Sequence, residues 1–414
     1  NPIVSIHDQG AGGPCNVLTE LVEKSGGRVD ISKINLGDPT LSQMEIWGAE
    51  YQERYAIVLR AEDMPLFRRI CERFRCPLEE LGEVTGDGRI TVRDSRDNST
   101  PVDMPIESIV GGLPQRTIKD VAPASLATQF DPAGLAVKDA LLRVLRIPAV
   151  GSKAFLVDRV DHTVGGRMAQ NQRCGPFGLP VADCAVSLVS REAGFLGTVV
   201  SIGEQPLKTT LDPAAGTRMA IAEAVTNMAG VAISNLSLAH LQGNVMSPGT
   251  KGGEMHKLYT ALTAGVRDFL PKLGFPQSGG KDSMSMTAID ADGRMVKAPN
   301  TFVATLQAVV PDVRQVVTPD LKRDGGSYLG LIDIGAGKPR MGGSALAQTF
   351  GHLGDESPDI NDPALLVNAF CAVQQLIKEG LLLSYHDRSD GGLITAVLEM
   401  AFAVYSSPDV RFQQ

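Results

Sequence analysis

Short apolar runs and amphipathic stretches follow one another along the 414 residues of the chain. Apolar positions that recur every three or four residues predict helices, whereas short apolar runs bounded by Gly or Pro predict strands. Mixed helices and short strands with modest alternation favour α+β layers over an all-parallel sheet, so we predict an α+β fold. The predicted helices cover residues 135–145, 213–233, 257–270 and 393–404. The predicted strands cover residues 3–6, 154–157, 185–188, 284–289, 302–310, 328–334 and 381–383.

One stretch of the sequence occurs twice. Residues 7–13, HDQGAGG, match residues 386–392, HDRSDGG, and the offset of 379 residues continues into the next predicted helix, where Glu20 matches Glu399. Each copy follows an apolar run and ends in glycines that open an amphipathic helix, which predicts a strand, a tight loop and a helix. A repeat over this distance is too long for a solenoid and indicates two copies of a multi-domain unit.

The composition changes between the two copies. Residues 98–134 are rich in Pro, Ser and Gly, which is typical of a connecting segment, and we place a linker at residues 113–134. A second division at about residue 311 separates two regions that each contain helices and strands. The predicted domains cover residues 1–112, 135–311 and 312–414.

Composition and charge exclude several classes of protein. The net charge is -8, with 43% hydrophobic and 21% charged residues, which gives no bias towards nucleic acid or an anionic membrane. Glu223 and Asn227 interrupt one of the longest apolar stretches, so nothing approaches the roughly 18 apolar residues of a membrane span. The six cysteines form no CxxC pair, and we expect reduced thiols and a cytoplasmic protein. Because the chain begins at Asn1 without methionine, we expect a segment of something larger.

The predicted helix over residues 213–233 carries the most informative pair of polar residues. Glu223 and Asn227 are four positions apart, which places them on one helix face among Ala and Met. A buried carboxylate needs compensation, and Mg²⁺ would supply it because this ion takes oxygen ligands and leaves positions for phosphate. The alternative is a hydrogen-bonded core pair, which this helix alone favours.

Two aspartates and one glycine-rich run are further candidates. Asp183 at the entrance to an apolar strand and Asp387 in the repeated loop could provide additional carboxylates, although such residues are more often caps or turns. Residues 278–283, SGGKDS, fit the SGGxDS loop of ATP pyrophosphatases. In those enzymes a buried strand precedes the loop, whereas here the preceding stretch is short and is interrupted by Pro276. The run does not satisfy the GxxxxGK[ST] pattern either.

Several runs together resemble one family, the large single-chain phosphoribosylformylglycinamidine synthases, in the same order and over nearly the whole chain. The runs cover residues 6–13, 45–54, 180–183, 223–227, 280–286 and 386–392. This family is related to aminoimidazole ribonucleotide synthetase and has a duplicated pair of A-type and B-type domains. The resemblance thus implies that the chain contains part of the first B-type domain, the linker, the second A-type domain and most of the second B-type domain.

The resemblance also implies a reaction and its partners. In this family ATP phosphorylates the amide oxygen of formylglycinamide ribonucleotide, and ammonia from glutamine displaces the phosphate to form an amidine. The duplication implies two nucleotide sites, each with ATP or ADP and Mg²⁺. The resemblance implies that the second site has a structural role. The missing synthetase and glutaminase domains would belong to the same full-length protein.

Carried over by position, the resemblance implies the residues of the second site. Asp183, Glu223, Asn227 and Asp387 look like its Mg²⁺ ligands. Ala182 and Ser389 would lie near the nucleotide, and Lys153 would contact phosphate. Asp8, the repeat partner of Asp387, would serve the Mg-nucleotide of the first, catalytic site.

Three functions therefore remain in competition. The first is a segment of an amidine-forming ligase, and the second is a module in which bound nucleotide stabilises the fold without chemistry. The third, an ATP pyrophosphatase, predicts AMP and pyrophosphate as products.

Overall fold

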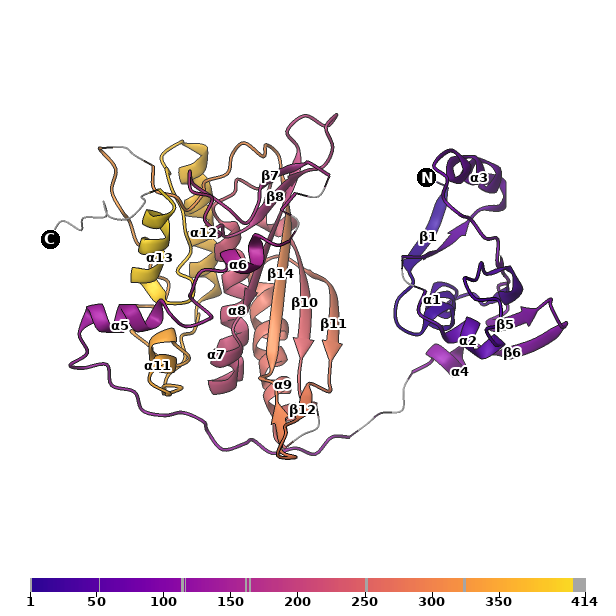
Figure 1. Cartoon of the computed structure of the whole chain (residues 1–414), viewed down its shortest axis with the longest axis horizontal. Coiled ribbons are helices and arrows are strands. Elements are labelled where there is room, and N and C mark those ends of the chain that lie inside the picture. Colours follow the sequence, from indigo (N-terminus) through magenta and orange to yellow (C-terminus); the bar gives the residue numbers. More distant parts are fainter. Residues whose placement is uncertain are drawn as a thin grey trace. The chain divides into compact units, whose positions relative to one another are not determined.

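The computed structural model describes residues 2–51, 53–112, 115, 117–160, 162–163, 165–249, 252–322 and 325–404. The chain divides into two compact units, Asn1–Thr117 and Ile118–Gln414, which we call unit 1 and unit 2. Each combines helices with antiparallel and parallel strand pairs, so the predicted α+β class is confirmed (Figure 1). No helix in the described part of the chain is long and apolar enough to cross a membrane.

Unit 1 contains a four-stranded sheet in the order β4-β2-β5-β6, with a separate antiparallel pair of β1 and β3. Its core contains Ile31, Ile46, Ile90 and Val92, which are fully buried. The strands are β1 Ile3–Asp8, β2 Gly27–Asp30, β3 Tyr55–Leu59, β4 Gly82–Val84, β5 Arg89–Asp94 and β6 Ser99–Pro105. The helices are α1 Gly13–Leu21, η1 Ile31–Lys33, α2 Gln43–Gly48, η2 Ala61–Asp63, α3 Met64–Arg73 and α4 Glu107–Val110.

Unit 2 is built on a six-stranded sheet in the order β11-β10-β14-β9-β8-β7, in which only β10 and β11 are parallel. These strands are β7 Met168–Gln170, β8 Ala185–Leu188, β9 Gly197–Glu204, β10 His240–Met246, β11 Gln277–Ser283 and β14 Thr301–Val310, and β12 Thr287–Ile289 pairs with β13 Met295–Lys297. The helices are α5 Val137–Val144, α6 Ala154–Val157, α7 Pro206–Leu211, α8 Pro213–Met228, η3 Leu236–Leu238, α9 Glu254–Leu262, the π-helix η4 Thr263–Phe269, α10 Leu270–Leu273, α11 Ala345–Thr349, α12 Pro363–Lys378 and α13 Gly392–Phe402.

Helix α8 is the central helix of unit 2. Pro213 occupies its first turn and Asp212 caps it, accepting hydrogen bonds from two backbone N–H groups. One face of α8 packs against β9 and β14, and α12 lies on its other side (Figure 1). A Cβ on Gly203 of β9 would lie 2.0 Å from the carbonyl oxygen of Ala220. Because glycine has no Cβ, α8 can approach β9 closely here. This approach places Glu223 and Asn227 of α8 next to the end of β9.

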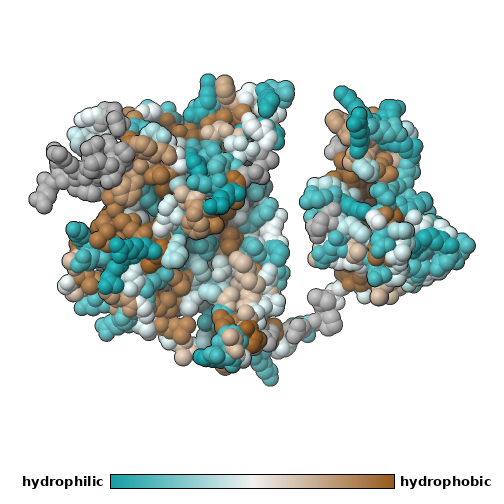
Figure 2. Space-filling model, viewed as in Figure 1, coloured by the Kyte–Doolittle hydropathy of each residue, from teal (hydrophilic) through white to brown (hydrophobic). Residues whose placement is uncertain are grey.

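Helix α13 follows the second copy of the repeat and is buried over part of its surface. Leu398 and Met400 are buried, whereas Ile394 and Phe402 are exposed. Figure 2 shows a hydrophobic surface over this helix. Gly12 and Gly391, which precede α1 and α13, both have a left-handed backbone, with φ of 82° and 97°, so the two copies begin their helices with the same glycine-dependent turn.

Several predicted elements differ from the structure. Residues 154–157 form α6, because the N–H groups of Leu156 and Val157 donate to the Lys153 carbonyl. Short apolar runs are ambiguous between helix and strand. Residues 328–334 form no strand, and neither do residues 381–383, where the Leu381 N–H closes a turn on Leu376 at the end of α12. Only the first copy of the repeat thus follows a strand.

Other predictions hold with shifted ends. The prediction for residues 185–188 coincides with β8, and that for 302–310 with nearly all of β14. The predicted helix 257–270 consists of α9, the π-helix and α10 in succession. The SGGKDS run lies within β11 and pairs with β10, so it is an edge strand and not a loop that follows a strand. This placement argues against the pyrophosphatase hypothesis.

Candidate functional site: a buried carboxylate cluster in unit 2

Three segments of unit 2 that are far apart in sequence meet at one place. Asp183 lies in the loop that enters β8, Glu223 and Asn227 lie on α8, and His386 and Asp387 lie in the repeated loop before α13. The candidate ligand atoms of Asp183, His386 and Asp387 lie within 4.8 Å of one another. The structure therefore brings two of the four predicted metal ligands into direct proximity.

His386 connects two acidic residues at the centre of this cluster. Its Nδ1 lies 2.6 Å from Asp183 Oδ1, and its Nε2 lies 3.0 Å from Glu399 Oε2 on α13. The histidine side chain is 5% exposed and that of Asp183 is 7% exposed. Because ionised carboxylates only accept hydrogen bonds, both ring nitrogens act as donors in this arrangement.

Asp387 is buried but incompletely paired. Its Oδ2 lies 3.4 Å from the hydroxyl of Thr226 on α8, and the neighbouring Ser389 acts to lower the pKa of this carboxyl group. Among the residues that the structure describes, its Oδ1 has no hydrogen-bond partner. A buried acceptor without a partner costs about 1–3 kcal/mol, and more when it is charged, so a cation bound at this oxygen would lower the cost.

Glu223 and Asn227 approach the cluster from α8. Glu223 Oε2 accepts hydrogen bonds from the Glu204 N–H at 2.7 Å and from Gln205 Nε2 at 2.8 Å. Asn227 Nδ2 donates to the Ile202 carbonyl at 2.9 Å, which leaves its amide oxygen for the pocket that Asn227 lines. Both side chains are thus oriented by the end of β9.

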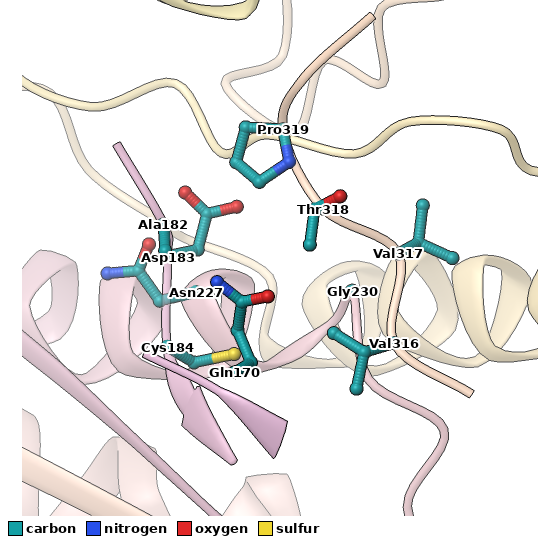
Figure 3. A pocket seen from close by; sticks show the side chains of 10 residues that line it. All are labelled: Gln170, Ala182, Asp183, Cys184, Asn227, Gly230, Val316, Val317, Thr318 and Pro319. Carbon is teal, nitrogen blue, oxygen red and sulfur yellow. The ribbon is translucent and has the colours of Figure 1, made fainter. Parts of the chain in front are cut away.

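A small pocket lies beside the cluster (Figure 3). Asp183, Ala182, Asn227, Gln170 and Thr318 are among the residues whose side chains line it. Its volume is about 10 Å³, which is roughly the room that one water molecule needs. This cavity suits an ion or a water molecule, so a nucleotide would have to lie outside it.

The ionisation of these groups reflects their burial. Burial raises the pKa of Asp183 and Asp387 above the usual value, and for Asp387 the charge of Asp183 adds to the effect. Burial also raises the pKa of Glu223 to about 7. Burial opposes the charged form of His386, but Asp183 and the hydrogen bonds to Asp183 and Glu399 outweigh it and raise this pKa to about 10. The single positive charge of His386 is therefore shared among several carboxyl groups.

A magnesium ion fits this donor set. Mg²⁺ prefers oxygen ligands and usually binds through one or two carboxylates, with phosphate or water in its other positions. Asp183 and Asp387 provide carboxylates, and the unpaired Asp387 Oδ1 is the atom that most needs a cation. A divalent ion would also favour the ionised forms whose pKa values burial raises.

The other predicted residues have different surroundings. Ala182 lines the pocket and Ser389 contacts Asp387. Lys153 Nζ donates to the carbonyl of Gly151 at 2.6 Å, within its own loop. In unit 1, the side chain of Asp8 is 79% exposed beside His7.

Sequence reasoning assigned no role to four residues of this region. His386 and Glu399 were visible as members of the repeat, opposite His7 and Glu20, and this correspondence was the available signal. Thr226 and Tyr385, whose hydroxyl donates to the Thr226 carbonyl at 2.8 Å, gave no comparable signal.

Two family models match the chain. One is described as the FGAR-AT PurM_N-like domain and matches residues 152–309. The other is described as AIR synthase related protein, C-terminal domain, and matches residues 1–95 and 331–406. The C-terminal model thus matches both copies of the repeated loop, and the N-terminal one matches the region that contains Asp183 and α8.

Two solved structures from Thermotoga maritima have a similar fold. PurL complexed with ADP is 20% identical, with a TM-score of 0.57 over 77% of this chain and 48% of that one. PurL complexed with FGAR is 21% identical, with a TM-score of 0.54 over 77% of this chain and 47% of that one.

Curated relatives match almost the whole chain. A probable phosphoribosylformylglycinamidine synthase, chloroplastic/mitochondrial, from Arabidopsis thaliana is 43% identical over 97% of this chain and 29% of its own length. Phosphoribosylformylglycinamidine synthase from Homo sapiens is also 43% identical, over 97% of this chain and 31% of its own length. The chain thus spans about a third of the length of these relatives. With this identity and the duplicated domains on which the site is built, the chain belongs to the phosphoribosylformylglycinamidine synthase family.

Proposed function

We propose that unit 2 provides a Mg-nucleotide site within an ATP- and glutamine-dependent ligase, which converts formylglycinamide ribonucleotide to formylglycinamidine ribonucleotide in purine biosynthesis. The observation that carries this proposal is the unpaired, buried Oδ1 of Asp387 beside Asp183. An acidic cluster with this geometry suits a cation that also binds phosphate. Membership in the family supports the reaction.

The four proposed Mg²⁺ ligands come from different parts of unit 2. Asp183 and Asp387 bind Mg²⁺ through carboxylate oxygens, and Glu223 and Asn227 complete the oxygen donors from α8. When bound, Mg²⁺ neutralises phosphate charge.

Three further residues have proposed roles around the nucleotide. Ala182 and Ser389 lie next to it, and Lys153 reaches its phosphates after leaving the Gly151 carbonyl. Asp8 is proposed to serve the nucleotide of the other, catalytic site.

The whole protein is proposed to use ATP, formylglycinamide ribonucleotide and ammonia derived from glutamine. The Thermotoga maritima structures named as complexes with ADP and with FGAR support these ligand classes. The remaining synthetase and glutaminase domains would lie in the rest of the full-length protein, since the relatives are about three times longer. We also propose a cytoplasmic location.

The proposed domains are the end of a first B-type domain at residues 1–112, a linker at 113–134, a second A-type domain at 135–311 and a second B-type domain at 312–414. The boundary between units 1 and 2, after Thr117, falls inside the proposed linker and supports it. Residues 113, 114, 116 and 405–414 lie outside the described part of the chain.

A second candidate function is structural. Asp183, Glu223 and Asn227 belong to the proposed A-type domain, whereas Asp387 belongs to the B-type domain. A cation with its nucleotide would connect the two domains at the point where Thr226 and Tyr385 already link them by hydrogen bonds. Bound nucleotide would then stabilise unit 2 by mass action, without chemistry.

Calorimetric titration of Mg-ADP into the full chain tests the nucleotide site. We expect binding by the wild type and a loss of at least about tenfold in affinity for Glu223→Ala, which corresponds to about 1.4 kcal/mol. Glu379→Ala is the matched control, because this exposed glutamate follows the last residue of α12 and accepts a hydrogen bond from Gln375. Equal affinities in wild type and Glu223→Ala would remove Glu223 from the ligand set.

The products formed from ATP separate the remaining functions. Stabilisation by Mg-ADP without any hydrolysis of ATP supports the structural role. ADP and phosphate that disappear in Glu223→Ala argue for chemistry at this site, and AMP with pyrophosphate would revive the pyrophosphatase hypothesis.

A further inference from the structure

His386 lies among the candidate metal ligands but is not free to act as one. Its two ring nitrogens face Asp183 Oδ1 at 2.6 Å and Glu399 Oε2 at 3.0 Å. A nitrogen that donates its proton to a carboxylate has no lone pair for a metal. The geometry therefore separates the buried group of three into two carboxylates that can bind a cation and one imidazole that holds a carboxylate in place.

The far end of this chain of hydrogen bonds is anchored on a helix. Glu399 lies in the second half of α13, between the buried residues Leu398 and Met400. Its side chain is 22% exposed, and its Oε2 lies 3.0 Å from His386 Nε2. Asp183 lies in a loop, which confines a side chain less well than a helix does. Hydrogen bonds thus connect Glu399 on α13 through His386 to Asp183. They restrict the position of the Asp183 carboxylate.

The same pair of residues recurs in unit 1. His7 Nε2 lies 3.2 Å from Glu20 Oε2 on α1, and the sequence positions correspond to His386 and Glu399. A close contact between the loop histidine and the helix glutamate is therefore a feature of both copies of the fold. Only in unit 2 of the described chain does the other nitrogen of the ring reach a carboxylate from a distant segment.

We propose that His386 and Glu399 are positioning residues, which orient the Asp183 carboxylate for a divalent cation without binding the cation themselves. The cation is a small, hard ion that prefers oxygen ligands, and the inference rests on the metal site of the proposed function. Partners of this kind usually contribute about 10- to 100-fold to metal affinity.

The test measures binding of Mn²⁺, as a stand-in for Mg²⁺, to the full chain by the loss of the free-ion signal in electron paramagnetic resonance. Glu399→Ala removes the anchor, and we expect its affinity to fall by about 10- to 100-fold. Glu399→Gln keeps an oxygen that accepts from Nε2, so we expect it to retain most of the affinity. Equal loss in both variants, or no loss in either, would overturn the positioning role.

A matched control separates positioning from general destabilisation. Asp359→Ala breaks the largely buried ion pair with Arg218 in the same unit, where the closest atoms are 2.7 Å apart, and we expect it to lower stability but leave Mn²⁺ affinity unchanged. Weaker Mn²⁺ binding in this variant, equal to that of Glu399→Ala, would reduce Glu399 to a structural residue.

The bound Mn²⁺ also reports on its ligands. We expect its electron spin echo to lack the strong nitrogen coupling of a directly coordinated imidazole. Such a coupling that disappears in His386→Ala would make His386 a ligand and overturn the proposal. A wild-type chain that binds no Mn²⁺ would overturn both this proposal and the metal site, whereas binding that is insensitive to Glu399 would overturn only the positioning role.

Discussion

The two copies of the repeated loop share their local structure and differ in their surroundings. In both, a left-handed glycine opens a helix, and the histidine before the aspartate lies within 3.2 Å of a glutamate on that helix. His7 is 47% exposed and Asp8 79% exposed, whereas the side chain of His386 is 5% exposed. The sequence of the loop thus determines the turn and the histidine–glutamate pair, but neighbouring segments determine the electrostatics.

The difference has an identifiable cause. In unit 2 the loop lies against α8 and the Asp183 loop, which together exclude water and add further carboxylates to the cluster. Within the described residues of unit 1, the Nδ1 of His7 instead lies 2.8 Å from the backbone carbonyl of Asp8. A binding loop of this kind becomes a cation site only when another segment supplies oxygens and burial.

Replacing the aspartate of each loop should give the largest contrast between the copies. With Mg-ADP at 1,000 times its dissociation constant, we expect wild-type unit 2 to gain about 4 kcal/mol by mass action. Asp387→Asn should remove most of this gain because it replaces a charged carboxylate ligand by a neutral amide, whereas Asp8→Asn should retain the gain. Thermal unfolding followed by circular dichroism measures both, and Trp47, the single tryptophan, reports on unit 1 separately.

A gain that persists in Asp387→Asn would place the nucleotide elsewhere. Equal losses in the two variants would contradict the expected contrast between the two copies.

The pH dependence of stability should show a smaller difference between the two copies than the binding of Mg-ADP does. Folding raises the pKa of Glu223 from 4.5 to about 7, so the native state binds more protons in this range and its stability falls as pH rises from about 4.5 to 7. The shift corresponds to about 3 kcal/mol. His386, raised from 6.5 to about 10, acts with the same sign at higher pH.

Urea unfolding at several pH values, without metal, measures this effect. We expect Glu223→Gln to become more stable relative to wild type as pH rises from about 4.5 to 7, and added Mg²⁺ to diminish the difference, because the cation favours the ionised carboxylate. A constant difference over this range would show that Glu223 is not forced into a poorly solvated position.

The sequence predicted the parts of this fold that depend on local pattern. The α+β class, β8 and most of β14 followed from apolar periodicity, and the repeat identified both loops. Residues 154–157 were wrongly predicted as a strand because four apolar residues suit either structure, and tertiary packing decides between them. The C-terminal end of α8 and the start of α9 were also misplaced.

The candidate site was predictable only in part. Asp183, Glu223, Asn227 and Asp387 were proposed from resemblance, and their joint use as ligands stays a prediction. His386 could not be assigned a role because its partner Asp183 lies 203 positions away in the sequence, and no spacing rule reaches that far. The match between Glu20 and Glu399 in the repeat was the only sign in the sequence of the pair formed by His386 and Glu399.

The smallest expected effect concerns that pair in unit 1. The side chains of His7 and Glu20 are 47% and 40% exposed, and exposed ion pairs contribute at most about 1 kcal/mol to stability. We therefore expect Glu20→Gln to change the free energy of unfolding of unit 1 by less than about 1 kcal/mol, measured by urea titration with Trp47 fluorescence. A loss well above this value would mean that the histidine–glutamate pair is itself a stabilising element, and the contrast with unit 2 would then lie in the strength of the pair and not in the carboxylate that Asp183 adds.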